Sequence, residues 1–168
     1  MLHDPASMNG GLNLADYTSE ALLVPTLKEK DTAGVIQELG RKLQQEGRLS
    51  DLLPFYNAAL NREFLFPTAI EPGIALPHAR LGGLPQLSFA LGRCDEPIRW
   101  GNKTSAVRLV FLLAVPSSET AGYLNLIAGL ARLGKQPQIL QALLSAASEQ
   151  AMWSVLKEIT LRNGSPGL

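Results

Sequence analysis

Three side chains around a short proline-rich stretch have the chemistry to handle an anionic group. His78 lies in the segment EPGIALPHAR, and Arg62 and Arg80 stand before and after it along the chain. A neutral imidazole is a good nucleophile near pH 7, because its unperturbed pKa lies close to that value. A guanidinium group can bond two oxygens of a phosphoryl or carboxylate group at once. The combination indicates a site for an anionic group, with His78 as the candidate nucleophile.

The same residues leave a structural role open. A single histidine after a strand often serves only as a core residue, and Arg80 is equally compatible with a solvated surface charge. Gly73 allows close approach of the backbone, while Pro72 and Pro77 stiffen the segment and restrict the direction of the His78 side chain. Loops at strand ends are where rigid scaffolds display reactive groups. The local sequence therefore favours a functional histidine without excluding a structural one.

The flanking segments predict the elements that position this stretch. Residues 66–80 are dense in proline and are expected to form loop and short strand. Hydrophobic spacing and capping residues define the remaining elements. These are an edge strand over 21–25, a helix from the N-cap Asp31 to Gly47, a helix from the N-cap Ser50 towards Phe64, strands over 87–94 and 106–115, and helices over 119–133, from Pro137 and from the N-cap Ser148.

The stretch 106–115 decides the fold class. It is almost continuously apolar, as in a central strand that is covered on both faces. A three-layer α/β arrangement with helices on both sides of the sheet satisfies that requirement. We expect a flexible leader over residues 1–18, a single domain over 19–162 and a tail over 163–168.

Composition limits the class of protein. With 168 residues, 15 basic and 15 acidic, the chain has no net charge that would attract nucleic acid or an anionic membrane, and its longest apolar run is too short to span a bilayer. Its single cysteine, Cys94, suits a reducing cytoplasm. There is no glycine-rich phosphate loop and no pair of residues at metal-ligand spacing, so we expect neither a cofactor nor a metal.

A longer stretch carries a family resemblance. The segment NREFLFPTAIEPGIALPHAR is similar to the histidine motif of the fructose/mannitol-type (type 2) enzyme IIA domains of the bacterial phosphoenolpyruvate-dependent sugar phosphotransferase system. The similarity continues through CDEPIRWGNKTSAVRLVFLLAVP and covers about residues 20–160. The positions that match the motif are Arg62, Glu63, Thr68, Gly73, Ile74, Ala75, Leu76, Pro77, His78 and Ala79.

The resemblance implies a fold, a reaction and partners. The fold is a mixed parallel and antiparallel sheet of about five strands with helices on both faces. His78 would accept a phosphoryl group from an HPr-like phosphocarrier and pass it to a cysteine of an enzyme IIB domain, with Arg62 stabilising the phosphorylated site. Thr68 and Arg80 are supporting candidates, although Thr68 is equally suited to capping a turn. In the nitrogen-regulatory branch of the family, phosphorylation would instead tune binding to a regulatory target protein.

One position departs from the family pattern. The family usually carries a second histidine early in the helix after the long strand, and Tyr123 stands at the corresponding place. A tyrosine hydroxyl can donate to a phosphoryl oxygen but offers no imidazolium; a half-buried helix residue is the alternative reading. The substitution leaves open a third role, in which the chain binds a partner without being phosphorylated.

Overall fold

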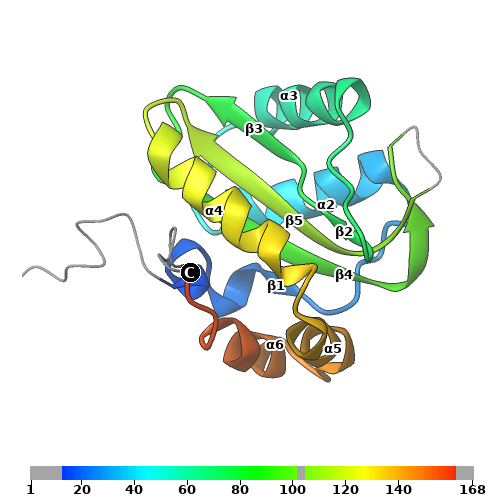
Figure 1. Cartoon of the computed structure of the whole chain (residues 1–168). Helices are drawn as coiled ribbons and strands as arrows, with labels where there is room; N and C mark the ends of the chain where they lie inside the picture. Colours follow the sequence, from blue (N-terminus) through cyan, green and yellow to red (C-terminus); the bar gives the residue numbers. More distant parts are fainter. Residues whose placement is uncertain (1–12, 102–104, 162–168) are drawn as a thin grey trace, which may run out of the picture.

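The apolar stretch 106–115 forms β5 (Ala106–Pro116), the central strand of the sheet in this computed structural model, which describes residues 13–101 and 105–161. β4 (Ser88–Arg99) pairs with β5 antiparallel, whereas β2 (Ile74–Ala75) and β3 (His78–Leu81) pair with it parallel. β1 (Leu23–Val24) adds a parallel edge next to β4. The described residues thus form a mixed sheet of five strands, as the family resemblance implies (Figure 1).

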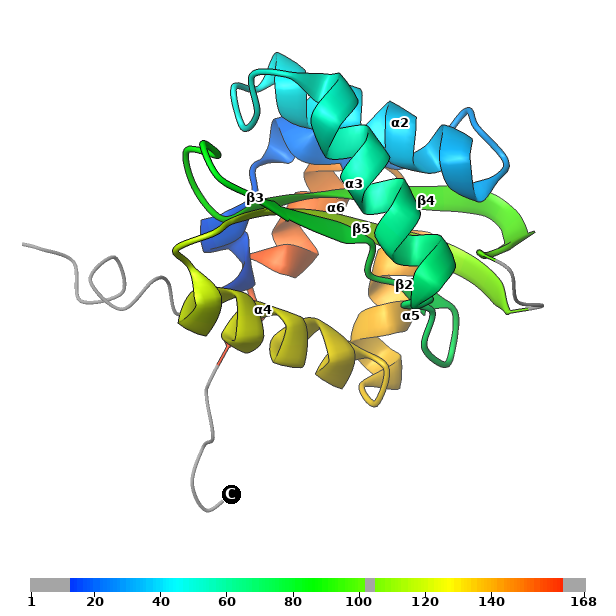
Figure 2. The same ribbon diagram turned by 90° about the horizontal axis from the view of Figure 1, so that it is seen from above.

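Alternate side chains of β5 enter two separate cores. Phe111 and Leu113 pack in the cluster that includes α4 (Thr120–Leu133), α5 (Pro137–Ser145) and α6 (Glu149–Leu156). Val110 and Leu112 face the cluster of α2 (Thr32–Gln45) and α3 (Leu52–Leu65). Figure 2 shows α2 and α3 over one face of the sheet and α4 over the other. The predicted three-layer α/β arrangement is confirmed.

Capping residues account for several helix boundaries. The Asp31 side chain accepts a hydrogen bond from the Gly34 amide, and the Ser148 side chain accepts one from the Ala151 amide, so both predicted N-caps are confirmed. Gly47 follows α2 with a φ of 74°, a left-handed conformation that glycine adopts without steric cost. The N-cap of α3 is Asp51 rather than the expected Ser50.

Two short segments differ from the expectation. The proline-rich stretch contains short strand as expected, in the form of β2 and β3, each parallel to β5, but His78 is the first residue of β3 rather than part of a loop after a strand. Residues 14–17 and 20–22 form the short 3-10 helices η1 (Leu14–Tyr17) and η2 (Glu20–Leu22). Leu14 and Tyr17, which fall within the expected leader, are buried in the core. The remaining leader residues 1–12 and the tail 163–168 lie outside the described residues, and the domain boundaries stay a prediction.

Helix length and hydropathy bear on membrane insertion. Over residues 13–101 and 105–161, none of the helices combines the length and the apolar character that crossing a bilayer requires.

Candidate functional site

His78 is held by the centre of the sheet. It pairs with Leu113 of β5, and the Leu113 amide donates to the Pro77 carbonyl at 2.9 Å. Its side chain lies on the α4 side of the sheet and is only 6% exposed. The backbone of the candidate nucleophile is therefore fixed by the most buried strand of the fold.

The hydrogen bonds of the imidazole define its tautomer. Nδ1 lies 2.9 Å from the Leu76 carbonyl oxygen, which can only accept, so Nδ1 carries the proton and donates. Nε2 is consequently unprotonated in the neutral ring. The Tyr123 hydroxyl lies 3.1 Å from Nε2 and donates to it, and the centroids of the two rings are 5.3 Å apart. The nitrogen with the free electron pair thus points at α4.

The electrostatics of the site keep this ring neutral. The pKa of His78 is lowered, first because burial disfavours the charged ring. The hydrogen bond to Leu76 acts in the opposite direction, and the charges of Arg62 and Glu63 oppose each other, the first lowering and the second raising the pKa. A neutral imidazole with a free Nε2 is the nucleophilic form of histidine.

The two arginines occupy different positions. Arg62 lies in the last turn of α3, where Nη1 donates to the Phe66 carbonyl at 2.8 Å and the guanidinium stands 5.1 Å from the centre of the Phe66 ring. Its charge acts on His78 from there. Arg80 is exposed, and its Nη2 donates to the Ser117 carbonyl at 3.1 Å and to the Thr120 hydroxyl at 2.5 Å. Arg80 therefore ties β3 to the start of α4.

Thr68 is part of a buried network rather than a free donor. Its hydroxyl donates to Glu63 Oε1 at 2.7 Å and accepts from the Leu76 amide at 3.0 Å. Trp100, at the end of β4, donates from Nε1 to Glu63 Oε2 at 2.8 Å. The single hydroxyl proton of Thr68 is thus committed to Glu63, so its contact with the site runs through Leu76.

The sequence analysis missed the connection between Glu63 and Trp100. A signal was available, because Phe55, Ala59 and Glu63 recur every four residues on α3 and are all fully buried. An acidic residue in register with an apolar helix face indicates a buried carboxylate with dedicated donors.

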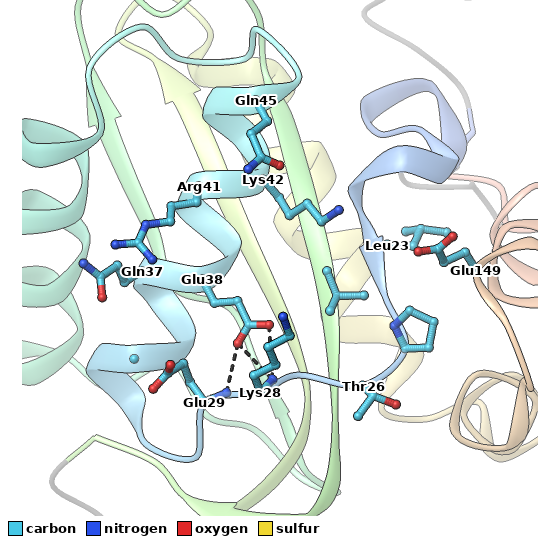
Figure 3. A pocket seen from close by; sticks show the side chains of 13 residues that line it. Leu23, Thr26, Lys28, Glu29, Gln37, Glu38, Arg41, Lys42, Gln45 and Glu149 are labelled. Carbon is cyan, nitrogen blue, oxygen red and sulfur yellow. Dashed lines mark hydrogen bonds between the residues drawn. The ribbon is translucent and has the colours of Figure 1, made fainter.

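A cleft of about 590 Å³ lies at the other edge of the sheet (Figure 3). It is bordered by α2, β1 and the start of α6, with Arg41, Lys42 and Glu149 among its lining residues. Glu38 in this cleft accepts hydrogen bonds from the amides of Lys28 and Glu29. None of the residues predicted from the sequence to form the site lines this cleft.

Comparison with known proteins extends over most of the chain. Residues 17–159 match the family model described as "Phosphoenolpyruvate-dependent sugar phosphotransferase system, EIIA 2". A nitrogen regulatory protein of Bradyrhizobium diazoefficiens is 31% identical over 144 residues, which are 85% of this chain and 94% of that protein. The fructose-specific EIIABC component of Bacillus subtilis is 29% identical over 148 residues; the match covers 88% of this chain but only 23% of that longer protein.

A solved structure has the same architecture. The crystal structure of the nitrogen regulatory protein IIA-Ntr from Neisseria meningitidis matches with a TM-score of 0.75 and 25% sequence identity. The match covers 85% of this chain and 98% of that one. The mixed sheet with helices on both faces is therefore a fold already observed for that protein.

Proposed function

The chain belongs to the EIIA 2 family of the phosphoenolpyruvate-dependent sugar phosphotransferase system, and on that premise we propose that His78 is its phosphoryl acceptor. In this proposal Nε2 takes a phosphoryl group from an HPr-like phosphocarrier protein and passes it to the cysteine of an enzyme IIB domain. Arg62 provides positive charge for the phosphoryl oxygens, and Tyr123 provides a hydroxyl donor. Arg80 holds the β3 end against α4 and is a weaker candidate for direct contact.

The transfer balances without a cofactor. The Nε2 electron pair forms the new bond to phosphorus while the bond between phosphorus and the donor breaks, and that electron pair returns to the donor. The ring then carries a positive charge, since Nδ1 keeps its proton, and the Leu76 carbonyl stabilises that charge through the existing hydrogen bond. In the onward step a thiolate sulfur attacks phosphorus, and the Nε2 pair returns to a neutral ring.

One observation carries this proposal. The 2.9 Å hydrogen bond from Nδ1 to the Leu76 carbonyl leaves Nε2 as the only nitrogen with a free electron pair, and that nitrogen faces Tyr123. An unprotonated Nε2 is the form of the ring that a nucleophilic histidine requires. The 6% exposure also supports the proposal, because a nearly buried phosphoryl group is protected from water.

The names of the related proteins suggest which protein receives the phosphoryl group from His78. An enzyme IIB domain is the acceptor we propose first, because the EIIA part of the Bacillus relative is joined to B and C components in one protein, as its name states. We include a cytoplasmic setting in this proposal; the free cysteine Cys94 is compatible with a reducing compartment.

A regulatory role is the second candidate. The Bradyrhizobium nitrogen regulatory protein matches this chain over 94% of its own length. In this reading the output is not transfer to a IIB domain but binding to a regulatory target, tuned by the charge that the phosphoryl group adds to His78.

A single reconstitution tests the acceptor role. The chain is incubated with phosphoenolpyruvate, enzyme I and HPr, in a sugar-type and a nitrogen-type set, and the acid-labile adduct is detected by intact mass and ³¹P NMR. We expect one phosphoryl group on the wild-type chain and none on His78→Gln. Absence of the adduct with both donor sets would overturn the proposal. An enzyme IIB domain is then added to the phosphorylated chain. Transfer of the phosphoryl group to the IIB domain supports the carrier role, and its absence supports the regulatory role.

A further inference from the structure

A fully buried carboxylate stands at the far end of the hydrogen bonds that hold the His78 ring. Glu63 is 0% exposed, although its neighbour Arg62 on α3 is partly exposed. Its oxygens accept from Trp100 Nε1 at 2.8 Å, from the Thr68 amide at 2.7 Å and from the Thr68 hydroxyl at 2.7 Å. Taking a carboxylate out of water is costly unless dedicated donors replace the water. Here the donors come from two segments far apart in sequence.

The contacts extend from this carboxylate to the imidazole through the backbone of one residue, Leu76. The Thr68 hydroxyl donates a hydrogen bond to Glu63. Its oxygen accepts a hydrogen bond from the Leu76 amide at 3.0 Å. The Leu76 carbonyl in turn accepts from His78 Nδ1 at 2.9 Å. Leu76 lies in the gap between β2, which ends at Ala75, and β3, which begins at His78. In this gap the Leu76 amide is held by the Thr68 side chain. The acceptor of the imidazole proton is therefore placed by side chains as well as by the sheet.

We propose that Glu63 is a positioning residue for His78, which acts through the Thr68 hydroxyl and the backbone of Leu76, with Trp100 fixing the carboxylate from the end of β4. This inference rests on the proposed function, because its purpose is to keep Nε2 unprotonated and aimed at the incoming phosphoryl group. Glu63 touches neither the ring nor the reacting atoms in this arrangement. It determines which tautomer the ring adopts and where Nε2 points.

The charges of neighbouring residues support such a role. The carboxylate of Glu63 raises the pKa of His78, whereas the guanidinium of Arg62 lowers it. The two adjacent residues thus act on the ring with opposite signs. Removing the Glu63 charge removes one of the two causes that raise the pKa of His78, so that pKa falls further.

The test measures the protonation state of the His78 ring in the unphosphorylated full chain. The chain has two histidines, so long-range ¹H–¹⁵N correlation spectra resolve both, and His3→Gln assigns them. The tautomer ratio and the pKa of His78 are measured in wild type, Glu63→Gln, Thr68→Val and Thr68→Ser. Thr68→Val removes only the hydroxyl at nearly constant shape, and Thr68→Ser is the matched control that restores it. Thr68→Val also carries the test if Glu63→Gln does not fold.

The outcomes separate positioning from a structural role. We expect the Nδ1–H form to dominate in wild type and in Thr68→Ser. In Thr68→Val its ratio to the Nε2–H form falls by about two- to tenfold, the equivalent of one neutral hydrogen bond. In Glu63→Gln the pKa of His78 falls as well. A folded Thr68→Val whose His78 tautomer ratio equals that of wild type would overturn the inference, however much stability it had lost.

The same measurement distinguishes this inference from the proposed function. The NMR spectra are recorded without a phosphoryl donor. If the wild-type chain forms no phosphoryl adduct, the acceptor role is refuted, but the effect of each variant on the His78 tautomer can still be measured. Unchanged spectra in variants of a chain that is phosphorylated refute the role of Glu63 alone. If both hold, Thr68→Val is also phosphorylated more slowly than Thr68→Ser.

Discussion

The two nitrogens of the His78 ring face very different surroundings. On the Nδ1 side, hydrogen bonds of Leu76, Thr68 and Glu63 are joined through the Leu76 backbone and end in a buried carboxylate. On the Nε2 side, the Tyr123 hydroxyl is the partner that the structure records. The first side holds several linked hydrogen bonds, whereas the second holds one recorded contact that an incoming group can displace. The comparison indicates that one side fixes the state of the ring and the other leaves room for chemistry.

The largest expected effect comes from breaking the network side. In Glu63→Leu, the Trp100 indole and the Thr68 hydroxyl and amide lose their acceptor. A buried unpaired donor costs about 1–3 kcal/mol, so we expect the free energy of unfolding to fall by about 3 kcal/mol or more. Urea denaturation measures it. Glu63→Gln, which retains an acceptor, should lose much less. A loss below about 1 kcal/mol in Glu63→Leu would show that the network carries little stability.

The next effect concerns the charge that flanks the ring. Arg62→Gln should slow phosphorylation about ten- to a hundredfold, because hydrogen bonds to charged groups contribute about 1.5–3 kcal/mol. The same change should raise the pKa of His78, since the Arg62 charge lowers it. Initial rates with an HPr-like donor and an NMR titration test both statements. Arg62→Lys is the control that keeps the charge. A wild-type rate in Arg62→Gln would remove Arg62 from the site.

A smaller effect is expected on the Nε2 side. Tyr123→Phe removes one neutral hydrogen bond, so phosphorylation should slow by about two- to tenfold, and stability should change by less than about 1 kcal/mol. Tyr56→Phe on α3 is a matched control. Tyr123→His should be at least as fast as wild type, because an imidazolium can donate to a phosphoryl oxygen. If Tyr123→Phe lost as much stability as Glu63→Leu, the contrast between the two sides would disappear.

The smallest effect is a pH dependence of stability. The folded pKa of His78 is lowered from the ordinary value of 6.5. As pH falls below that value, the unfolded chain binds the proton first, so stability decreases until the folded pKa is reached. In His78→Gln this component is absent, and the urea midpoint should vary less over that interval. Parallel pH profiles for the two proteins would contradict the assignment of a buried neutral ring.

Local patterns predicted the fold better than they predicted the site. The apolar run of β5 and the capping residues Asp31 and Ser148 are properties of neighbouring residues, and their prediction succeeded for that reason. A short strand was expected within 66–80, but its position at His78 was not, because the four residues of β3 gain their structure from pairing with β5, which no local period records. The bond between Glu63 and Trp100 joins positions 37 apart in sequence, and only the folded chain brings them together.

The candidate site shows the same division. The motif identified His78, Arg62 and Thr68 as a group, and Tyr123 was found only through its place in the family pattern. The structure adds the direction of each contact. Thr68 directs its proton away from the ring, and Arg80 is engaged by Ser117 and Thr120. Residue type indicates which chemistry a side chain can perform. Which hydrogen-bond partner the side chain has depends on the three-dimensional packing.

The pairing of His78 with β5 has a consequence for how the molecule opens. Amides of a central strand exchange with solvent only through the largest unfolding events, whereas helix ends fray at little cost. The amide of Leu113, which bonds to Pro77, should therefore exchange with the slowest group in the chain. Tyr123 lies in the first turn of α4, and terminal helical turns open more readily than a central strand. We therefore expect the contact on the Nε2 side to open more often than the backbone of β3, which would let a partner reach Nε2 while β3 stays paired with β5.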